Sequence, residues 1–392
     1  MESELFYRIA LTRVPGIGPM LAKSLFRHVG EASVIFRTPA TALGKIRGIG
    51  KMRAWAIAGF KQFRSVEKEM AFIEKYKVRA LFFTDAGYPR RLSDHADSPV
   101  LLYYMGSADL NAANVVAVIG TRTPTSYGKE VIDRVVGEFT VPDLLLVSGL
   151  AYGIDVLAHK AALNRQLATV GVLGHGLDRI YPPQHSSLAR QMVAQGGLLT
   201  EFGIGTEPDE HHFPLRNRII AGMSDAVVVV ESGSRGGSML TVDNALAYRK
   251  KVYAIPGRIM DSKSAGANAL IQQGKARLLS DGRQLIRELE QQKEPESKSP
   301  VAPALPGMLP EGRSGVVSPE QETARQRTDL RLSRLTPEER SIMEVLQPGK
   351  RISLDDLMRN ELLSRPSIPL ALLRLEIQGL IRPFPGKSYG RV

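Results

Sequence analysis

Four arginines stand in loops that follow short apolar runs of the sequence, and their side chains are well suited to holding phosphate. A planar guanidinium presents paired N–H donors that match phosphate oxygens better than a lysine ammonium does. Loops of this kind that meet at one edge of a protein form a cradle for phosphate groups. The arginines expected to build that cradle are Arg122, Arg216, Arg218 and Arg235.

The positions of three of these arginines lead to different expectations. Arg122 follows a strand-ending glycine, which places it at the edge of a sheet, where it either holds phosphate or forms an ion pair between loops. Arg216 and Arg218 are two residues apart, so a helix points them to different sides. We expect one of them to face a ligand and the other to pair with a carboxylate such as Glu201 or Asp225.

An aromatic residue, Phe213, begins the run Phe213-Pro-Leu-Arg-Asn-Arg-Ile-Ile-Ala-Gly222, directly after His211 and His212. A flat side chain beside cations suits stacking against nucleobases. Phe213 could instead fill the core, and both interpretations stand. Asn217, between the two arginines of this run, joins the expected contact residues.

Glycines and hydroxyl residues fill the other loops. The turn Gly236-Gly237-Ser238 opens a helix that runs through Thr241, so unpaired N–H groups and the Ser238 hydroxyl form an anion site. Alternatively, the glycines only permit a sharp turn from strand to helix. The same loop type predicts contacts from Gly120, Thr121, Ser148, Gly149 and Gly174.

Short apolar runs precede these loops and alternate with helical segments between residues 114 and 270. Continuous apolar runs are typical of parallel strands buried on both faces. In such a sheet the loops at the carboxyl ends of the strands share one rim, where ligands bind. The fold class expected is therefore α/β with a parallel sheet. Its expected strands are 114–119, 144–147, 168–173, 226–230 and, last, 252–255, with two more at 80–83 and 100–104 in a connecting piece over 78–110.

The composition is basic and lacks cysteine. The chain has 392 residues, a formal net charge of +12 and a pI of about 9.8, which fits a polyanionic partner. The lack of cysteine excludes disulfides, thiolate metal sites and cysteine nucleophiles. The start Met1-Glu-Ser-Glu-Leu5 lacks the layout of a signal peptide, and no apolar stretch approaches the ~20 residues that span a bilayer. We expect a soluble cytoplasmic protein with no membrane partner.

Residues 1–70 are expected to form a helical domain with an internal repeat. Val14-Pro-Gly-Ile-Gly18 precedes an apolar helix over 20–26, and Ile46-Arg-Gly-Ile-Gly50 precedes another over 52–57. The repeat resembles tandem helix-hairpin-helix motifs, in which a glycine turn leads into a helix whose N–H groups can contact phosphate. A small helical domain whose glycines only form turns is the alternative.

Residues 71–290 are expected to form the sheet domain, and the composition changes beyond it. Residues 291–334 are dominated by Lys, Glu, Pro, Ser and Gly, which predicts a flexible linker. Residues 335–392 show the layout of a winged helix. Its parts are a capping box at Thr336-Pro-Glu-Glu339, a helix start at 353–356, a third helix over 368–378 and a hairpin over 380–391. Arg374 is the only basic residue of that third helix, which favours docking to a protein over recognition of a DNA groove.

A series of motifs in order connects the chain to a known family. The chain resembles the DNA-processing protein A family (DprA, also called Smf), most strongly from about residue 88 to 282. The motifs are Tyr88-Pro89, Ser98-Pro99, Gly120-Thr-Arg122, Ser148-Gly-Leu-Ala-Tyr-Gly-Ile-Asp155, Gly176-Leu-Asp178 with Tyr181-Pro182, the run from Phe213 to Gly222, Gly237-Ser-Met-Leu-Thr241, Pro256-Gly257 and Asn268-Ala-Leu-Ile-Gln-Gln-Gly274.

The resemblance implies an extended Rossmann-like domain between a helical N-terminal domain and a winged C-terminal domain. It implies a homodimeric, non-enzymatic protein, without cofactor or metal, that binds single-stranded DNA regardless of sequence. Such a protein protects incoming DNA and helps to load a RecA-type recombinase in natural transformation or recombination. By position, Arg122 would hold phosphate and Phe213 would stack on bases. The expected nucleic-acid-binding residues are Gly120, Thr121, Arg122, Ser148, Gly149, Gly174, Phe213, Arg216, Asn217, Arg218, Arg235, Gly236, Gly237, Ser238 and Thr241.

Three positions depart from the family's usual pattern. Tyr152 stands where many members have arginine, and His175 stands where a small hydroxyl residue is common. Glu210 belongs to the run Asp209-Glu-His-His212, where a basic residue often precedes the Phe-Pro step. These departures predict weaker binding than the family norm, or binding favoured at low pH when a histidine becomes charged.

An enzyme that hydrolyses a nucleotide N-glycosidic bond is the alternative for the same loops, and a sensor of a small nucleotide is a further one. Asp243, after Gly237, is the nearest candidate general acid or base, and Glu231 stands at a strand end. No motif places a second acid. The loop from Gly120 to Gly128 is not Gly-x-Gly-x-x-Gly, and no Gly-x-x-x-x-Gly-Lys-[Ser/Thr] occurs, so the case for NAD or ATP is weak.

Overall fold

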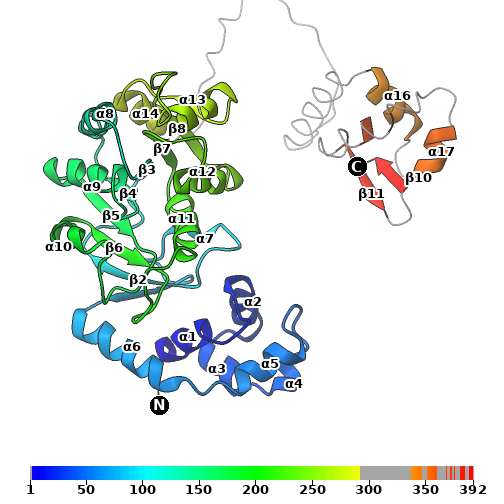
Figure 1. Cartoon of the computed structure of the whole chain (residues 1–392). Helices are drawn as coiled ribbons and strands as arrows, with labels where there is room; N and C mark the ends of the chain where they lie inside the picture. The colour runs from blue at the N-terminus through cyan, green and yellow to red at the C-terminus, as the bar shows by residue number, and fades with distance from the viewer. Residues whose placement is uncertain are drawn as a thin grey trace, which may run out of the picture. The chain divides into compact units, whose positions relative to one another are not determined.

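The structure, a computed structural model, describes residues 2–291, 337–346, 351–359, 368, 371, 372, 375, 380–384 and 388–391. The chain divides into two compact units, Met1–Ser299 and Pro300–Val392 (Figure 1). Within the described ranges, no helix is long and apolar enough to cross a lipid bilayer.

The larger unit contains a mixed sheet of nine strands, counted over residues 2–291. The strand order is β1-β2-β6-β5-β4-β3-β7-β8-β9. Neighbours from β6 to β9 run parallel, whereas β1, β2 and β6 pair antiparallel. The strand order reverses between β3 and β7, and ligands of open α/β sheets bind outside the strand ends at such a point. The strands are β1 (Arg79–Phe82), β2 (Leu101–Gly106), β3 (Asn114–Ile119), β4 (Leu144–Ser148), β5 (Ala168–Val172), β6 (Gly197–Thr200), β7 (Ala226–Val229), β8 (Lys251–Ala254) and β9 (Arg277–Leu278).

The sheet confirms every strand predicted from an apolar run and corrects the prediction in three respects. The expected purely parallel sheet is mostly parallel, because β1 and β2 extend it with antiparallel pairing. The strand β8 is not the last, since β9 pairs beside it. The strand β6 was not predicted, because only Leu198 and Leu199 of its four residues are large and apolar. Two apolar residues between a glycine and a threonine do not form a recognisable strand pattern.

Helices cover both faces of the sheet, because successive residues of each strand point to opposite faces. Val115 and Ala117 of β3 belong to one apolar core, with side chains of α11, α12 and α13. Val116 and Val118 belong to the other core, with side chains of α8, α9 and α14. The helices are α7 (Arg90–Ser93), α8 (Ser126–Gly137), α9 (Ile154–Asn164), α10 (Ser186–Gln195), α11 (His212–Gly222), α12 (Gly237–Ala247), α13 (Ala265–Gln272) and α14 (Gly282–Glu290), with a 3₁₀ turn, η1, over Pro183–His185.

A helical layer precedes the sheet and packs against β1 and β2 (Figure 1). Its core includes Phe82 of β1 and Tyr103 of β2, and an ion pair of 2.5 Å joins Arg13 to the buried Glu69. Burial raises the pKa of Glu69, and the backbone N–H of Ile204 donates to its carboxylate at 3.0 Å. The helices are α1 (Glu4–Thr12), α2 (Pro19–Val29), α3 (Ala32–Arg37), α4 (Ala40–Leu43), α5 (Gly50–Ala58) and α6 (Phe63–Tyr76). The two predicted helices that follow glycine turns are α2 and α5.

In the smaller unit, the described residues form a three-stranded antiparallel sheet in the order β10-β12-β11. The pairing of β11 with β12 confirms the predicted hairpin, and helices begin near both predicted starts. Most of the predicted helix over 368–378, and the predicted linker beyond residue 291, lie outside the described residues. The elements are α16 (Pro337–Val345), β10 (Arg351–Ser353), α17 (Leu354–Arg359), β11 (Ile381–Phe384) and β12 (Ser388–Arg391).

Candidate functional site

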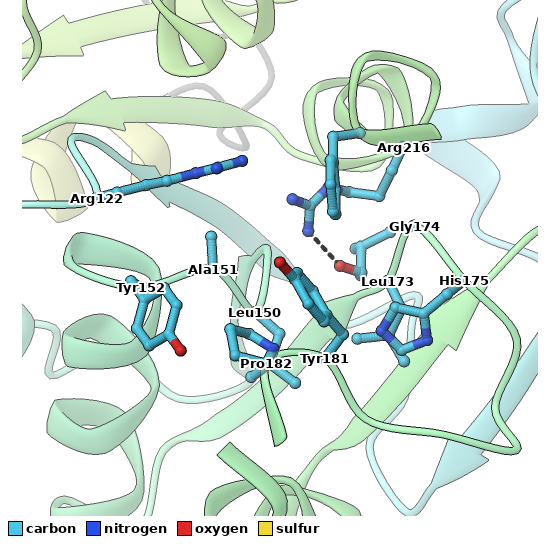
Figure 2. Close-up of a pocket in the computed structure, with 12 residues that line it drawn as sticks. Arg122, Leu150, Ala151, Tyr152, Leu173, Gly174, His175, Tyr181, Pro182 and Arg216 are labelled. Atoms are coloured by element: carbon cyan, nitrogen blue, oxygen red, sulfur yellow. Dashed lines mark hydrogen bonds between the residues drawn. The ribbon is translucent and has the colours of Figure 1, made fainter. Parts of the chain in front are cut away.

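Two adjoining hollows lie at the carboxyl ends of the parallel strands, where the predicted loops meet. The small hollow has a volume of about 460 Å³ and lies between the loops after β3, β4 and β5 and the start of α11 (Figure 2). The large hollow has a volume of about 1260 Å³ and extends toward the start of α12. Both hollows share Arg122, Ala151, Phe213 and Arg216, so they form one continuous concave site.

Phe213 lies at the junction of the hollows, in the first turn of α11. Its ring centroid is 5.6 Å from Cζ of Arg122 and 5.9 Å from Cζ of Arg216. The ring is also 6.2 Å from that of Tyr181, at an interplanar angle of 31°. A Cβ at Gly174 would lie 3.0 Å from the Phe213 ring, so the glycine makes room for it. The aromatic ring therefore borders the hollows and also packs against their wall.

Arg122 is an exposed cation that projects across the small hollow toward Arg216 (Figure 2). Its loop is fixed by the Thr121 N–H, which donates to the carbonyl of Glu231 at 2.7 Å, and by the Thr121 carbonyl, which accepts from Ile154 at 3.1 Å. No carboxylate in the described part of the chain forms an ion pair with Arg122. The alternative role predicted for it, an ion pair between loops, is therefore not observed there.

Arg216 is a buried cation beneath Phe213. Its Nη1 donates to the carbonyl of Val172 (Figure 2), and its Nε donates to Oδ1 of Asn217 at 3.1 Å. Burial lowers the pKa of Arg216; the charge of Asp155 opposes that effect and the charge of Arg122 adds to it. Burial has the opposite effect on the acid, because it raises the pKa of Asp155. Two guanidinium groups thus repel each other across the small hollow, and an anion between them would relieve that repulsion.

Arg218 does not join these cations, which corrects its predicted place in the phosphate cradle. Its guanidinium donates to Oε2 of Glu201 and to the carbonyl of Asp97, each at 2.5 Å. The side chain lines neither hollow. The prediction that one arginine of this pair binds a carboxylate is confirmed with Glu201, whereas Asp225 pairs with Arg91 at 2.6 Å.

The start of α12 forms one wall of the large hollow. Gly236 has a φ of 142°, a backbone conformation that favours glycine, and the exposed Arg235 precedes it. Asn217 Nδ2 donates to the carbonyl of Gly237 at 3.0 Å, and the hydroxyls of Ser238 and Ser232 lie 2.8 Å apart. The buried Thr241 also donates to Gly237, at 3.3 Å. These bonds brace a helix start whose N–H groups suit an anion.

Two predicted contact residues lie beneath the site and not on its surface. Ser148 is fully buried, and its hydroxyl donates to the carbonyl of Val118 at 2.6 Å. Gly149 lines neither hollow, because its Cα packs against the guanidinium of Arg216 and the carboxylate of Asp155. Their position at the end of an apolar run was predicted from the sequence, but their burial beneath the surface of the site was not. The remaining predicted residues, Gly120, Thr121, Arg122, Gly174, Phe213, Arg216, Asn217, Arg235, Gly236, Gly237, Ser238 and Thr241, line one or both hollows.

Several lining residues were not assigned to the site from sequence. Tyr181 closes the small hollow and extends its ring toward the centre (Figure 2). Tyr152 also lines the small hollow, and its hydroxyl donates to Oε1 of Gln184 at 2.9 Å. His175 is buried, which lowers its pKa, and its Nδ1 lies 2.9 Å from the carbonyl of Gly176. Tyr181 belongs to the motif Tyr181-Pro182. Its position in the segment that follows β5 was the signal that could have assigned it to the site.

The two acids proposed for hydrolysis lie elsewhere. Glu231 is buried and accepts from the N–H and the hydroxyl of Thr125 at 2.9 and 2.5 Å, so it anchors the start of α8. Asp243 is exposed and lines neither hollow. The carboxylates that do line the large hollow are Asp155 and Glu210.

The fold and site define a Rossmann-like α/β protein whose strand-end loops gather arginine and aromatic side chains at the point where the strand order reverses. This class of site suits a ligand that carries both phosphate and flat rings. Residues 79–290 match the family described as DNA recombination-mediator protein A, and the chain belongs to that family.

Three relatives match this chain over nearly all of their own length. Protein Smf from Synechocystis sp. is 32% identical over 413 residues, which cover 100% of this chain and 99% of the relative. The X-ray structure of DNA processing protein A from Streptococcus pneumoniae has a TM-score of 0.63 at 32% identity and covers 72% of this chain and 97% of that one. DNA processing protein A from Helicobacter pylori, studied structurally for its single-stranded DNA binding mode, has a TM-score of 0.50 at 28% identity, over 55% of this chain and 97% of that one.

Proposed function

We propose that this chain binds single-stranded DNA regardless of sequence, in the continuous site formed by the two hollows. The observation that carries the proposal is the grouping of Arg122, Phe213 and Arg216. Cations that follow a backbone and rings that stack on bases are the two requirements of single-strand binding without sequence readout. The single-stranded DNA binding of the Helicobacter pylori relative supports the same conclusion.

In this proposal each part of the site has a separate task. Arg122 holds a phosphate at the surface, and Arg216 supplies fixed positive charge beneath it. Phe213, with Tyr181 beside it, stacks on a base. The start of α12 and Arg235 hold a further phosphate in the large hollow.

We further propose that the chain acts as a mediator and not as an enzyme. In that role, a homodimer protects a DNA strand and helps to load a RecA-type recombinase onto it. The domains in this scheme are a helical domain over 1–70, the DNA-binding domain over 71–290, a linker over 291–334 and a winged helix over 335–392. The family description as a recombination mediator supports this role.

Binding to labelled oligo-dT and to duplex DNA across a range of salt tests the proposal. With ~4–6 phosphates neutralised, the logarithm of the affinity for single strands falls with the logarithm of salt at a slope of about −3 to −4. Arg122→Ala weakens binding to all sequences alike, whereas Lys160→Ala, an exposed lysine of α9, leaves it unchanged. A flat salt slope or equal preference for duplex DNA would contradict single-strand binding.

Three further measurements test the mediator role and the hydrolase alternative. The mass of the protein in solution, with and without oligonucleotide, should be that of a dimer. Addition of the protein should speed the assembly of a RecA-type recombinase on a covered strand. Incubation with nucleoside monophosphates should release no base, and release would support the hydrolase instead.

A further inference from the structure

One face of α5 exposes large apolar side chains outside the site described above. Met52 is 87% exposed and Trp55 is 66% exposed. Lys51 lies one helical turn before Trp55, so these three residues share a face, while Ala54 and Ile57 face the core. Lys51, Met52 and Trp55, together with Arg47 in the preceding turn, are called the α5 face below. None of them lines either hollow.

The surroundings of the α5 face are strongly basic. Residues 14–64 contain nine lysines and arginines, at 23, 27, 37, 45, 47, 51, 53, 61 and 64, and a single acid, Glu31. Arg47 and Lys51 are exposed, and neither forms an ion pair with a carboxylate in the described part of the chain. Lys23, by contrast, is buried and donates to Ser98 at 2.5 Å. Within the ranges that the structure describes, no carboxylate therefore neutralises Arg47 and Lys51 beside Trp55.

Arg53 joins the two glycine turns into one unit. Its Nε donates to the carbonyl of Gly16 at 3.1 Å, and its Nη1 donates to the carbonyl of Gly48 at 2.9 Å. Gly16 and Gly48 have φ values of 77° and 90°, which favour glycine. The turn that carries Arg47 and the helix that carries Trp55 are thus held together before any ligand binds.

We propose that the α5 face is a second contact surface for single-stranded DNA, separate from the two hollows. Trp55 stacks on a base, Met52 extends the apolar platform, and Arg47 and Lys51 hold neighbouring phosphates. Lysine is depleted at the centre of protein–protein interfaces, whereas cations beside an exposed ring are what a single strand requires. The inference rests on the proposed function, because it extends the path of the same strand.

The chain has one tryptophan, so its emission reports on this surface alone. Oligo-dT is titrated into the full-length protein while Trp55 emission is followed, and the anisotropy of labelled oligo-dT is measured in parallel. We expect saturable quenching of Trp55. Arg47→Glu with Lys51→Glu should raise the concentration for half-quenching about tenfold and reduce the salt slope by about 1.4, at 0.7 per phosphate. Lys160→Glu, a matched exposed lysine on α9, should change neither.

The variant Phe213→Ala separates the two proposals, because it weakens the hollows and leaves the α5 face intact. Quenching that persists in this variant and depends on Arg47 and Lys51 supports the second surface. Binding that depends on Arg122 without any change in Trp55 emission overturns the second surface and leaves the proposed function standing. Quenching that is unaffected by the Arg47 and Lys51 substitutions also overturns it. If oligo-dT neither binds nor quenches, both proposals fall.

Discussion

Replacing Phe213 with alanine removes the ring that both hollows share. The ring lies within 6 Å of the guanidinium carbons of Arg122 and Arg216, at 5.6 and 5.9 Å. In the proposed complex it stacks on one base, and the loss of a stacked aromatic side chain costs about 1–3 kcal/mol per base. At about 1.4 kcal/mol per tenfold, the affinity for oligo-dT should fall about 5- to 150-fold.

The dependence on salt distinguishes this loss from the loss of a cation. Phe213→Ala removes no charge, so the slope of the logarithm of affinity against the logarithm of salt should stay unchanged. Arg122→Ala should make that slope shallower by about 0.7, the contribution of one phosphate contact to a single strand. The anisotropy of labelled oligo-dT at several salt concentrations gives both quantities.

Leu215→Ala is the matched control, because Leu215 is an exposed apolar residue of the same helix that lines neither hollow. Its affinity should equal that of the unaltered chain. An unchanged affinity in Phe213→Ala, or a slope that becomes shallower as in Arg122→Ala, would refute the stacking role.

Three further substitutions test how the site is supported. Gly149→Ala places a Cβ against Arg216 and Asp155 and so disturbs the hydrogen bonds of a charged group. Such a hydrogen bond contributes about 1.5–3 kcal/mol, so the affinity for oligo-dT should fall at least tenfold. An unchanged affinity would contradict this role of Gly149. Arg218→Met leaves Glu201, whose side chain is only 14% exposed, without its ion-pair partner. The free energy of unfolding in urea should fall by about 3 kcal/mol, with partial recovery in the double variant with Glu201→Gln. Burial lowers the pKa of His159 from 6.5 to about 4, so the folded state binds fewer protons than the unfolded chain between these values. Stability should therefore fall as pH drops from 6.5 through 4, by on the order of 3 kcal/mol more than in His159→Gln; parallel pH profiles of the two proteins would refute it.

Apolar runs predicted the central strands correctly, because a strand buried on both faces must be apolar at nearly every position. Gly197–Thr200 and Arg277–Leu278 gave no such signal, since the first has only two large apolar residues and the second has only one. The direction of β1 and β2 was also not predicted. Antiparallel pairing depends on the connection by which the chain returns to the sheet, and the composition of a strand does not indicate that connection.

The sequence predicted where the site residues lie along the chain, but it did not predict how deeply each of them is buried. Arg122 borders the hollows because it lies three residues beyond the end of β3, whereas Phe213 borders them because it lies in the first turn of α11. Ser148 is instead the last residue of β4 and is fully buried, where its hydroxyl donates to the carbonyl of Val118 on the adjacent strand β3. Arg216 and Arg218 differ only in the side of the helix they occupy, and their sequence spacing could not decide which one meets Glu201.

The buried setting of Arg216 has a consequence for how tightly a ligand can be held. A surface arginine surrenders on the order of 2 kcal/mol of rotamer entropy when a ligand immobilises it. The guanidinium of Arg216 is already oriented by Val172 and Asn217, so this loss occurs while the chain folds and not when a strand arrives. In the proposed complex, DNA therefore meets a cation whose direction is set in advance.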